Sequence, residues 1–453
     1  MVLNCCDSIV NEPCQKLSQP EKYLYKIWVN REFPQEHLQT IVGKKLSIVN
    51  SGTRNESAGP DFLEAVILLE DELKSGDIEI HNKNKEWYFH GHDNDAKYDN
   101  VILHVIREEC QEKYILNSKG EKIDVFHLPL KKTIIPIIGH PCKNWTLTNI
   151  QEFDELINDY ARKRFQYKTI NTRKALLQYQ PEQYFFIGML DVMGYSKNRI
   201  AMKSIAKNLD IDYLYQLLEK IEIEKRLLFL EAILLGIAGL LKPNYQVYYK
   251  HKNYFEALQK YWTKISKKYD FKTVENQKFH FAGNRPANYP HKRLIGLAQI
   301  INNIYPEKPG QECLNILFSG REPDKILLML KEKFQIPSGM WKNHPLFKSH
   351  KSSLLVGNGR MMDFLTNILL PFARAMSSIL KEEQNTKFCT EFNKHIPVGE
   401  VPGKIKKMLS RFGKSQSMIK TNYCLQGLIE YHRLFCDLDL CNICLLENII
   451  ESK

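Results

Sequence analysis

The hydrophobic positions of the chain change their period near residue 145. Before this point, short apolar or alternating segments separated by turn residues are typical of strands, whereas after it apolar residues recur at helical spacing over long stretches. The sequence therefore predicts an α+β fold. An N-terminal α/β domain with a mixed sheet, residues 1–145, precedes a large all-α domain, residues 146–453.

Within the N-terminal part, Leu24, Ile27 and Trp28 lie on one face of a predicted helix over residues 20–38. A hairpin is predicted where the stretch ELKSG, with its glycine, joins two apolar segments. Residues 85–100 are polar and aromatic and are predicted as loop or short helix. Strands are predicted at 45–52, 62–71, 77–84 and 101–106, followed by a second hairpin in which KYILNS and KIDVFHL flank KGE.

The composition changes this picture mainly through charge. With 43% hydrophobic and 26% charged residues, the chain has an ordinary globular composition, which argues against long disorder. Residues 1–150 hold 18 basic and 22 acidic residues, whereas residues 151–453 hold 46 and 30. A basic body beside an acidic domain suits a polyanion such as nucleic acid, and simple solubility is the alternative.

Several classes of protein are disfavoured. The N-terminus lacks the pattern of a signal peptide, and the richest apolar run, residues 226–243, is interrupted by Glu231, so we expect no membrane span. Eleven cysteines without framework spacing favour reduced thiols in a cytoplasm. The absence of phosphate-binding, dinucleotide-binding and G-x-S-x-G motifs argues against ATP-driven and acyl-transfer chemistry. The sequence does not define an oligomeric state.

The densest chemistry lies between residues 55 and 104. Asp61 opens one predicted strand of the first hairpin, and Glu79 and His81 share one face of the next, so the hairpin is expected to bring the carboxylates together. Two carboxylates and a third ligand can hold a divalent cation that activates water. We predict Asp61, Glu79 and His81 as catalytic residues, and the predicted ligands of a Mg²⁺ or Mn²⁺ ion are Asp61, Glu79, His90, His92 and Asp95.

The histidines also suggest softer metals. Residues 81, 90, 92 and 104 are four of the 14 histidines and fall within one short stretch. His81, His90 and His92 with nearby aspartates would equally suit zinc or manganese. The plain alternatives are that Asp61 caps a turn, that His104 is a core histidine, and that His90 and His92 are surface loop residues.

The order of Pro-Asp, hairpin and Glu-x-(usually Lys) resembles the restriction-endonuclease-like PD-(D/E)XK superfamily. The resemblance implies that Asp61 and Glu79 hold Mg²⁺ and that residue 81 lies beside the attacking water. Position 81 is His rather than Lys, which leaves catalysis in doubt because a neutral imidazole lacks the fixed charge of lysine. Related folds sometimes add a carboxylate from the first helix, which makes Glu21 a further candidate.

Longer stretches of the sequence are also distinctive. They are N-x-x-x-GPDF, GDIEIH, W-x-x-H-x-H-x-x-D-x-x-Y, GNRPANYPHKRL at 283–294, NGRMMDFLTNILLPFA at 358–373 and QGLIEYHRLFC near the C-terminus. These stretches resemble a family of bacterial proteins, domain of unknown function 2851. The resemblance covers most of the chain and brings no assigned activity.

Near the C-terminus, His432, Cys436, Cys441 and Cys444 have a spacing that can bind zinc or an iron–sulfur cluster. The single C-x₂-C has apolar neighbours, so packed thiols are the alternative.

The stretch GNRPANYPHKRL combines Arg285, Lys292 and Arg293 with an aromatic residue, which suits a nucleic-acid backbone and a stacked base. A rigid connector with solvated charges is the alternative.

Taken together, these features predict a metal-dependent nuclease that hydrolyses DNA or RNA. The alternative is a non-catalytic nucleic-acid-binding or scaffold protein with a degenerate nuclease-like core, favoured by the missing lysine at position 81. A third option uses the same histidines to hydrolyse another substrate.

Overall fold

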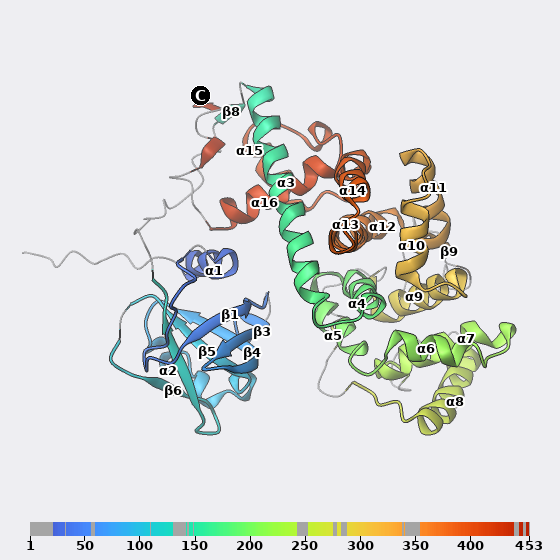
Figure 1. The fold of residues 1–453 in the computed structure, drawn as a ribbon, viewed down its shortest axis with the longest axis horizontal. Coiled ribbons are helices and arrows are strands. Elements are labelled where there is room, and N and C mark those ends of the chain that lie inside the picture. Colours follow the sequence, from blue (N-terminus) through green and yellow to red (C-terminus); the bar gives the residue numbers. More distant parts are fainter. Residues whose placement is uncertain are drawn as a thin grey trace, which may run out of the picture. The chain divides into compact units, whose positions relative to one another are not determined.

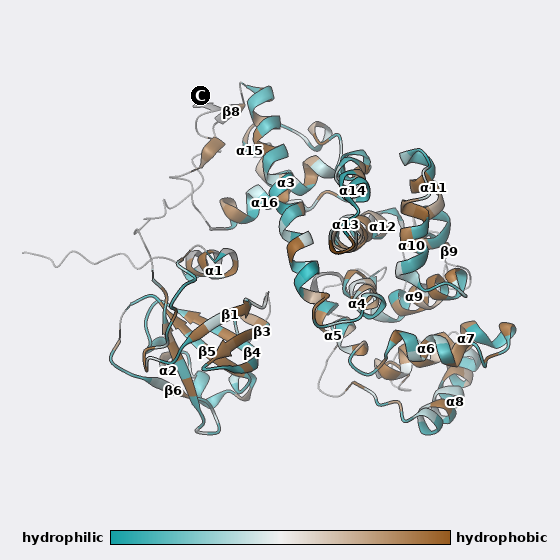
Figure 2. Cartoon of the chain, in the orientation of Figure 1, coloured by the Kyte–Doolittle hydropathy of each residue, from teal (hydrophilic) through white to brown (hydrophobic). Residues whose placement is uncertain are grey.

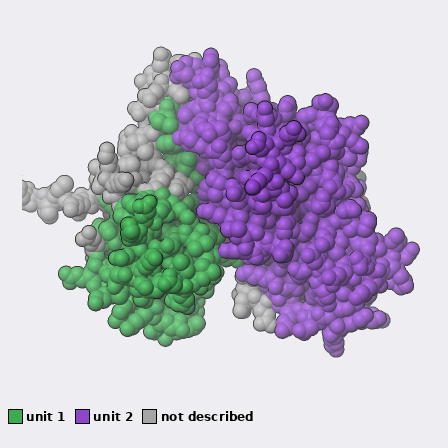
Figure 3. All heavy atoms as spheres, in the orientation of Figure 1, with its two compact units in different colours: residues 1–143, 432–448 green, residues 144–431, 449–453 purple. Residues whose placement is uncertain are grey.

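The computed structural model describes residues 21–452 apart from residues 32, 56–58, 109, 130–141, 143–144, 148, 242–251, 275–278, 282–287, 338, 340–353, 439–443 and 447–449. The chain forms two compact units (Figure 3). Unit 1 comprises Met1–Lys143 and His432–Asn448, and unit 2 comprises Asn144–Tyr431 and Ile449–Lys453. The predicted boundary at residue 145 lies close to this division, but the segment from His432 belongs to unit 1, whereas the sequence assigned it to the helical part.

Unit 1 is built on a seven-stranded mixed sheet in the order β1-β3-β4-β5-β7-β6, with β2 paired to β3 (Figure 1). β1, β3 and β4 are antiparallel neighbours, and β4, β5 and β7 run parallel. The elements are α1 Glu21–Asn30, β1 Leu46–Asn50, β2 Thr53–Arg54, β3 Phe62–Leu69, β4 Glu72–His81, α2 Glu86–Phe89, the 3₁₀ turns His92–Asn94 and Ala96–Tyr98, β5 Val101–Ile106, β6 Tyr114–Leu116 and β7 Lys122–His127.

Both faces of this sheet are covered, and successive side chains of a strand point to opposite faces. Phe126 contacts Trp28 of α1 on one face, whereas its neighbour Val125 packs with Trp87 of α2 on the other. Hydrophobic residues accordingly run along β3, β4 and β5 (Figure 2). Ile78 and Ile80 of β4 are buried on the α1 side of the sheet. Because side chains alternate along a strand, Glu79 and His81 face the α2 side.

The first hairpin turns at a different place from the one predicted. Its two-residue turn is Glu70–Asp71, where both residues have a positive φ, of 50° and 53°, as a type I′ turn requires. The stretch ELKSG lies within β4 instead. Gly76 is needed there for close packing, because a Cβ at this position would lie 2.5 Å from the carbonyl oxygen of Asn100.

Unit 2 is mainly helical, which confirms the predicted α+β class with a mixed sheet followed by a helical part. The described part of unit 2 also contains two small two-stranded sheets, β8 with β11 and β9 with β10. The strands are β8 Trp145–Leu147, β9 Ile336–Pro337, β10 Leu354–Val356 and β11 Ile450–Ser452. The helices are α3 Ile150–Ala175, α4 Pro181–Met193, α5 Tyr195–Ile205, α6 Ile211–Leu218, α7 Ile223–Ile237, α8 Lys252–Tyr269, α9 Pro290–Ile304, α10 Pro309–Leu317, α11 Pro323–Phe334, α12 Asn358–Phe364, a π-helical turn Leu365–Leu369, α13 Leu370–Ile379, α14 Glu383–His395, α15 Gly403–Arg411 and α16 Asn422–Leu434.

The core of unit 2 lies among α4, α7, α9 and α13, whose buried residues form one continuous hydrophobic cluster. Residues 226–237 of the predicted apolar run belong to α7 within it, as a buried helix. Among the helices in the described part of the chain, none combines the length and the apolar composition that a bilayer crossing needs.

Candidate metal and catalytic site

Asp61 and Glu79 lie side by side where β3 begins beside β4. The register pairs Phe62 with Ile78, which places the residues next to them together. The backbone N–H of Asp61 donates to Glu79 Oε2 at 2.9 Å, and the backbone N–H of Ile80 donates to Asp61 Oδ2 at 3.0 Å. The Asp61 carboxylate therefore binds the neighbouring strand, which disfavours the alternative that it only caps its own turn.

Each carboxylate keeps a second oxygen for another partner. Asp61 Oδ1 accepts a hydrogen bond from Arg54 Nη1 at 2.8 Å, and the guanidinium of Arg54 lies 3.8 Å from the ring centroid of Tyr25. Glu79 Oε1 instead faces the imidazoles of His81 and His92, at 3.5 and 3.3 Å from their Nε2 atoms. Glu79 is thus the carboxylate that joins the acidic residues to the histidines.

Burial, with a smaller contribution from neighbouring carboxylates, raises the pKa values of Glu79 and Glu21. Burial and then the Asp61 carboxylate raise the pKa of Glu79 to about 9. Burial, followed by Asp61, Glu86 and Glu79, raises the pKa of Glu21 to about 7. Glu21, at the start of α1 and a candidate from the sequence, is therefore close enough to these carboxylates to interact with them electrostatically. A bound cation would relieve the repulsion among these carboxylates.

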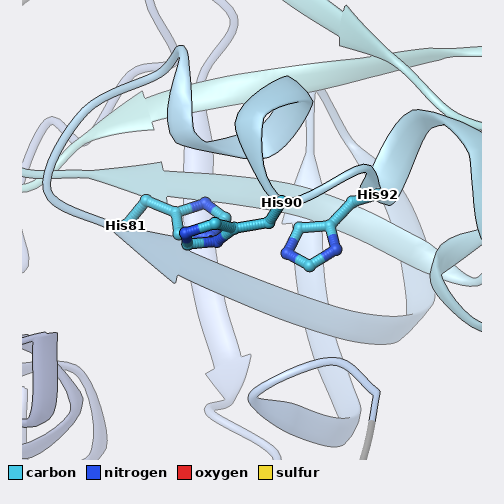
Figure 4. Close-up of side chains that lie close together, drawn as sticks. All are labelled: His81, His90 and His92. Atoms are coloured by element: carbon cyan, nitrogen blue, oxygen red, sulfur yellow. The ribbon is translucent and has the colours of Figure 1, made fainter.

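The side chains of His81, His90 and His92 lie close together (Figure 4). His81 comes from the end of β4, His90 follows α2, and His92 begins the next 3₁₀ turn. Gly91 between the last two has φ of 74°, a left-handed conformation that turns the chain so that both imidazoles approach His81. One ligand atom from each histidine lies within 4.8 Å of the other two. Among the described residues, these three histidines have ligand atoms close enough together to share one metal ion.

Burial keeps the inner histidines uncharged. Burial and the neighbouring His104, His92 and His90 lower the pKa of His81 to about 2, and burial and His92 lower that of His104 to about 3. His104 is enclosed beneath the cluster and contacts His81 rather than joining the three histidines as a ligand. His104 is therefore buried, as a core histidine would be, and it also contacts the site through its hydrogen bond to His81.

Asp95 lies outside the histidine group. Its carboxylate accepts from the backbone N–H of Lys97 at 3.0 Å and pairs with the Lys97 ammonium at 3.6 Å. Asp95 thus caps the second 3₁₀ turn, and the structure gives no support to its predicted role as a ligand.

The second predicted metal site is described only in part. Cys441 lies outside the described residues. His432 Nδ1 lies 3.1 Å from Asp437 Oδ1, and His432, Cys436 and Cys444 do not form a ligand group by themselves among the described residues.

The predicted nucleic-acid contacts are not exposed where the structure describes them. Arg285 lies outside the described residues, whereas Lys292 and Arg293 in the first turn of α9 are only 2% and 6% exposed. Arg293 Nη1 donates to the carbonyl of Leu355 at 3.0 Å. Lys292 and Arg293 were predicted to contact nucleic acid, with solvated charges as the alternative, and both side chains are instead packed inside unit 2.

Some residues of the site were not predicted from the sequence. Arg54 reaches Asp61 across a sheet edge, and Asn84 and Glu112 lie beneath the histidines, with no spacing pattern that relates them to the motif. Only the density of polar residues in HNKNKEW around Asn84 offered a signal.

The fold and the site together define an α+β protein that carries a buried cluster of carboxylates and histidines in its N-terminal unit. The profile of a family described as "Protein of unknown function (DUF2851)" matches residues 21–400, so the chain belongs to this family. No curated protein and no solved structure matches the chain.

Proposed function

We propose that the chain is a metal-dependent phosphodiesterase that acts on nucleic acid. The observation that carries this proposal is the position of Glu79, whose carboxylate binds the backbone of Asp61 on one side and faces two imidazoles on the other. A cation held there would neutralise the charge of a phosphodiester and activate a water molecule as the nucleophile. Asp61 and Glu79 orient the cation in this proposal.

The topology supports a restriction-endonuclease-like core. Apart from the two-residue β2 and two 3₁₀ turns, the order is a helix, three antiparallel strands, a short helical crossover and a parallel strand, which are α1, β1, β3, β4, α2 and β5. Asp61 precedes the second of these strands and Glu79 lies on the third, as the PD-(D/E)XK pattern requires. In this proposal Glu21 on α1 would serve as the additional helix carboxylate.

His81 serves as a metal ligand rather than as a general base in this proposal. The sequence left both roles open. A base whose pKa is held at about 2 accepts a proton poorly near neutral pH, whereas its uncharged imidazole is suited to binding a metal. Histidine in place of lysine at position 81 therefore changes how the water is activated, and the water remains the nucleophile.

The charge of the chain supports a polyanionic substrate. Residues 151–453 contain 46 basic and 30 acidic residues, an excess that attracts phosphates in a salt-dependent manner. A cytoplasmic location is part of the proposal, and the free thiols of the described cysteines favour it.

The second candidate is a non-catalytic nucleic-acid-binding or scaffold protein. The pairing of Arg54 with Asp61 favours it, because this ion pair occupies an oxygen that a metal would otherwise bind. Such a protein would bind nucleic acid without cleaving it.

Cleavage of labelled DNA and RNA oligonucleotides distinguishes the two candidates. We expect the wild-type chain to cleave one of them with a divalent cation, and Asp61→Asn to reduce the rate at least about a hundredfold, since it removes a charge beside the cation. Asp71→Asn, in the exposed hairpin turn, is the matched control and should retain the wild-type rate. Binding without cleavage under all cation conditions would support the scaffold candidate instead.

A further inference from the structure

A chain of hydrogen bonds runs beneath the histidines. Asn84 Nδ2 donates to the carboxylate of Glu112, and Asn84 Oδ1 lies 3.1 Å from His104 Nδ1. His104 Nε2 then lies 2.9 Å from His81 Nδ1. Each contact links one side chain to the next, from Glu112 near the surface to His81 at the centre of the cluster.

This chain fixes which nitrogen of His81 carries a proton. The carboxylate of Glu112 only accepts, so the amide of Asn84 must turn its oxygen toward His104. His104 therefore carries its proton on Nδ1, and as a neutral ring it accepts at Nε2 from His81 Nδ1. A neutral His81 then has its lone pair on Nε2, the atom that points toward Glu79 and His90.

The atoms around that lone pair have the spacing of a metal coordination sphere. His81 Nε2 lies 3.1 Å from His90 Nδ1 and 3.5 Å from Glu79 Oε1, and His92 Nε2 lies 3.3 Å from the same oxygen. In a tetrahedral site with metal–nitrogen distances of about 2.0–2.1 Å, neighbouring ligand atoms lie about 3.4 Å apart. His92 Nε2 is also buried without a hydrogen-bond partner, and a bound metal ion would satisfy this nitrogen.

We infer that His81, His92 and Glu79, with His90 at the open side, form a site for one zinc-class transition-metal cation rather than for Mg²⁺. Imidazole nitrogens suit zinc and its neighbours, whereas Mg²⁺ prefers oxygen ligands and retains its waters. His81 and His92 are buried and His90 is exposed, which leaves one side of the cation open to water or substrate, as catalytic zinc sites do. The inference rests on the proposed function in one respect, since it names the cation of that same site.

Calorimetric titration of the chelator-treated full chain with Zn²⁺ and, separately, with Mg²⁺ tests the inference. We expect one equivalent of Zn²⁺ to bind at least about a hundredfold more tightly than Mg²⁺. Substituting His92→Ala or the exposed His90→Ala should weaken Zn²⁺ binding about 10- to 100-fold or more. His395→Ala, an exposed histidine at the end of α14, is the matched control and should bind as the wild type does. Equal affinity for both cations, or unchanged Zn²⁺ binding by His90→Ala in a folded protein, would overturn the inference.

The hydrogen-bonded chain has its own test. Asn84→Leu removes the acceptor for His104 and should weaken Zn²⁺ binding about 10- to 100-fold. The double substitution Asn84→Asp with Glu112→Gln keeps an acceptor toward His104 and removes the facing charge, so it should restore the affinity. A loss of affinity that the double substitution does not restore would contradict the positioning role of Asn84.

Binding and cleavage can fail separately. Tight, histidine-dependent Zn²⁺ binding without cleavage would uphold the metal site and refute the phosphodiesterase. Cleavage with Mg²⁺ that is unaffected by His92→Ala would uphold the phosphodiesterase and refute the zinc-class site.

Discussion

Glu79→Gln is expected to reduce metal-dependent cleavage at least about a thousandfold while making the metal-free protein more stable at pH 8. Glutamine matches the shape of glutamate and can still accept the hydrogen bond from Asp61, but it lacks the charge that binds a cation. A residue that only supported the fold would not show both effects, since its loss would lower activity and stability together.

The gain in stability follows from the sign of the pKa shift. The pKa of Glu79 is raised from an ordinary 4.5 to about 9 in the folded protein, so the folded state holds this proton more tightly than the unfolded state between these values. The metal-free wild type therefore loses stability as the pH rises through this window, and glutamine removes that loss. Urea denaturation with a chelator present should show Glu79→Gln at least about 2 kcal/mol more stable at pH 8, with the difference vanishing near pH 4.

Glu72→Gln is the matched control, because Glu72 is an exposed residue of the same strand. It should leave both cleavage and stability unchanged. Wild-type cleavage by Glu79→Gln would refute the catalytic role of this carboxylate, and a loss of stability at pH 8 would show that its charge is accommodated without a cation.

Trp28→Ala is expected to destabilise unit 1 by about 4 kcal/mol, within the range for large aromatic residues removed from a core. Trp28 is fully buried, stacks on Phe33 at 6.2 Å between ring centroids, and donates from Nε1 to the carbonyl of Ser51 at 3.0 Å. Its removal leaves a cavity beneath α1 and an unpaired carbonyl. Because α1 carries Glu21, the site should be perturbed as well.

Chemical denaturation followed by far-ultraviolet circular dichroism measures this change. Phe89→Ala is a suitable control, since Phe89 is 85% exposed and should cost no more than about 0.5 kcal/mol. An equal loss in both variants would mean that α1 does not depend on Trp28 for its packing.

Local patterns were sufficient to predict the fold class and most strands. VILHVI is a nearly continuous apolar run that is buried on both faces of the sheet, and KIDVFHL begins with alternating apolar residues, so both strands could be predicted from neighbours along the chain. The turn of the first hairpin was misplaced because Gly76 resembles a turn residue. Glycine is required at position 76 because β5 approaches closely there, and local sequence does not encode this contact between segments.

The site divides in the same way. The approach of Asp61 to Glu79 was predicted from the order of the two strands, although the turn at Glu70–Asp71, and not the predicted loop ELKSG, sets the register that brings them together. The nearby histidines were predicted because they are dense in the sequence. Arg54, Asn84 and Glu112 reach the cluster through the packing of loops and sheet edges, which has no period. For Lys292, the charge of the side chain suggested exposure, whereas tertiary packing buries it.

Anomalous diffraction from crystals of the chain grown with Zn²⁺ tests most directly whether the cluster binds a cation. We expect one strong peak between Glu79 Oε1 and the Nε2 atoms of His81 and His92, absent from crystals of Glu79→Gln grown under the same conditions. A peak only at the C-terminal cysteines, or none within coordination distance of Glu79, would contradict this expectation.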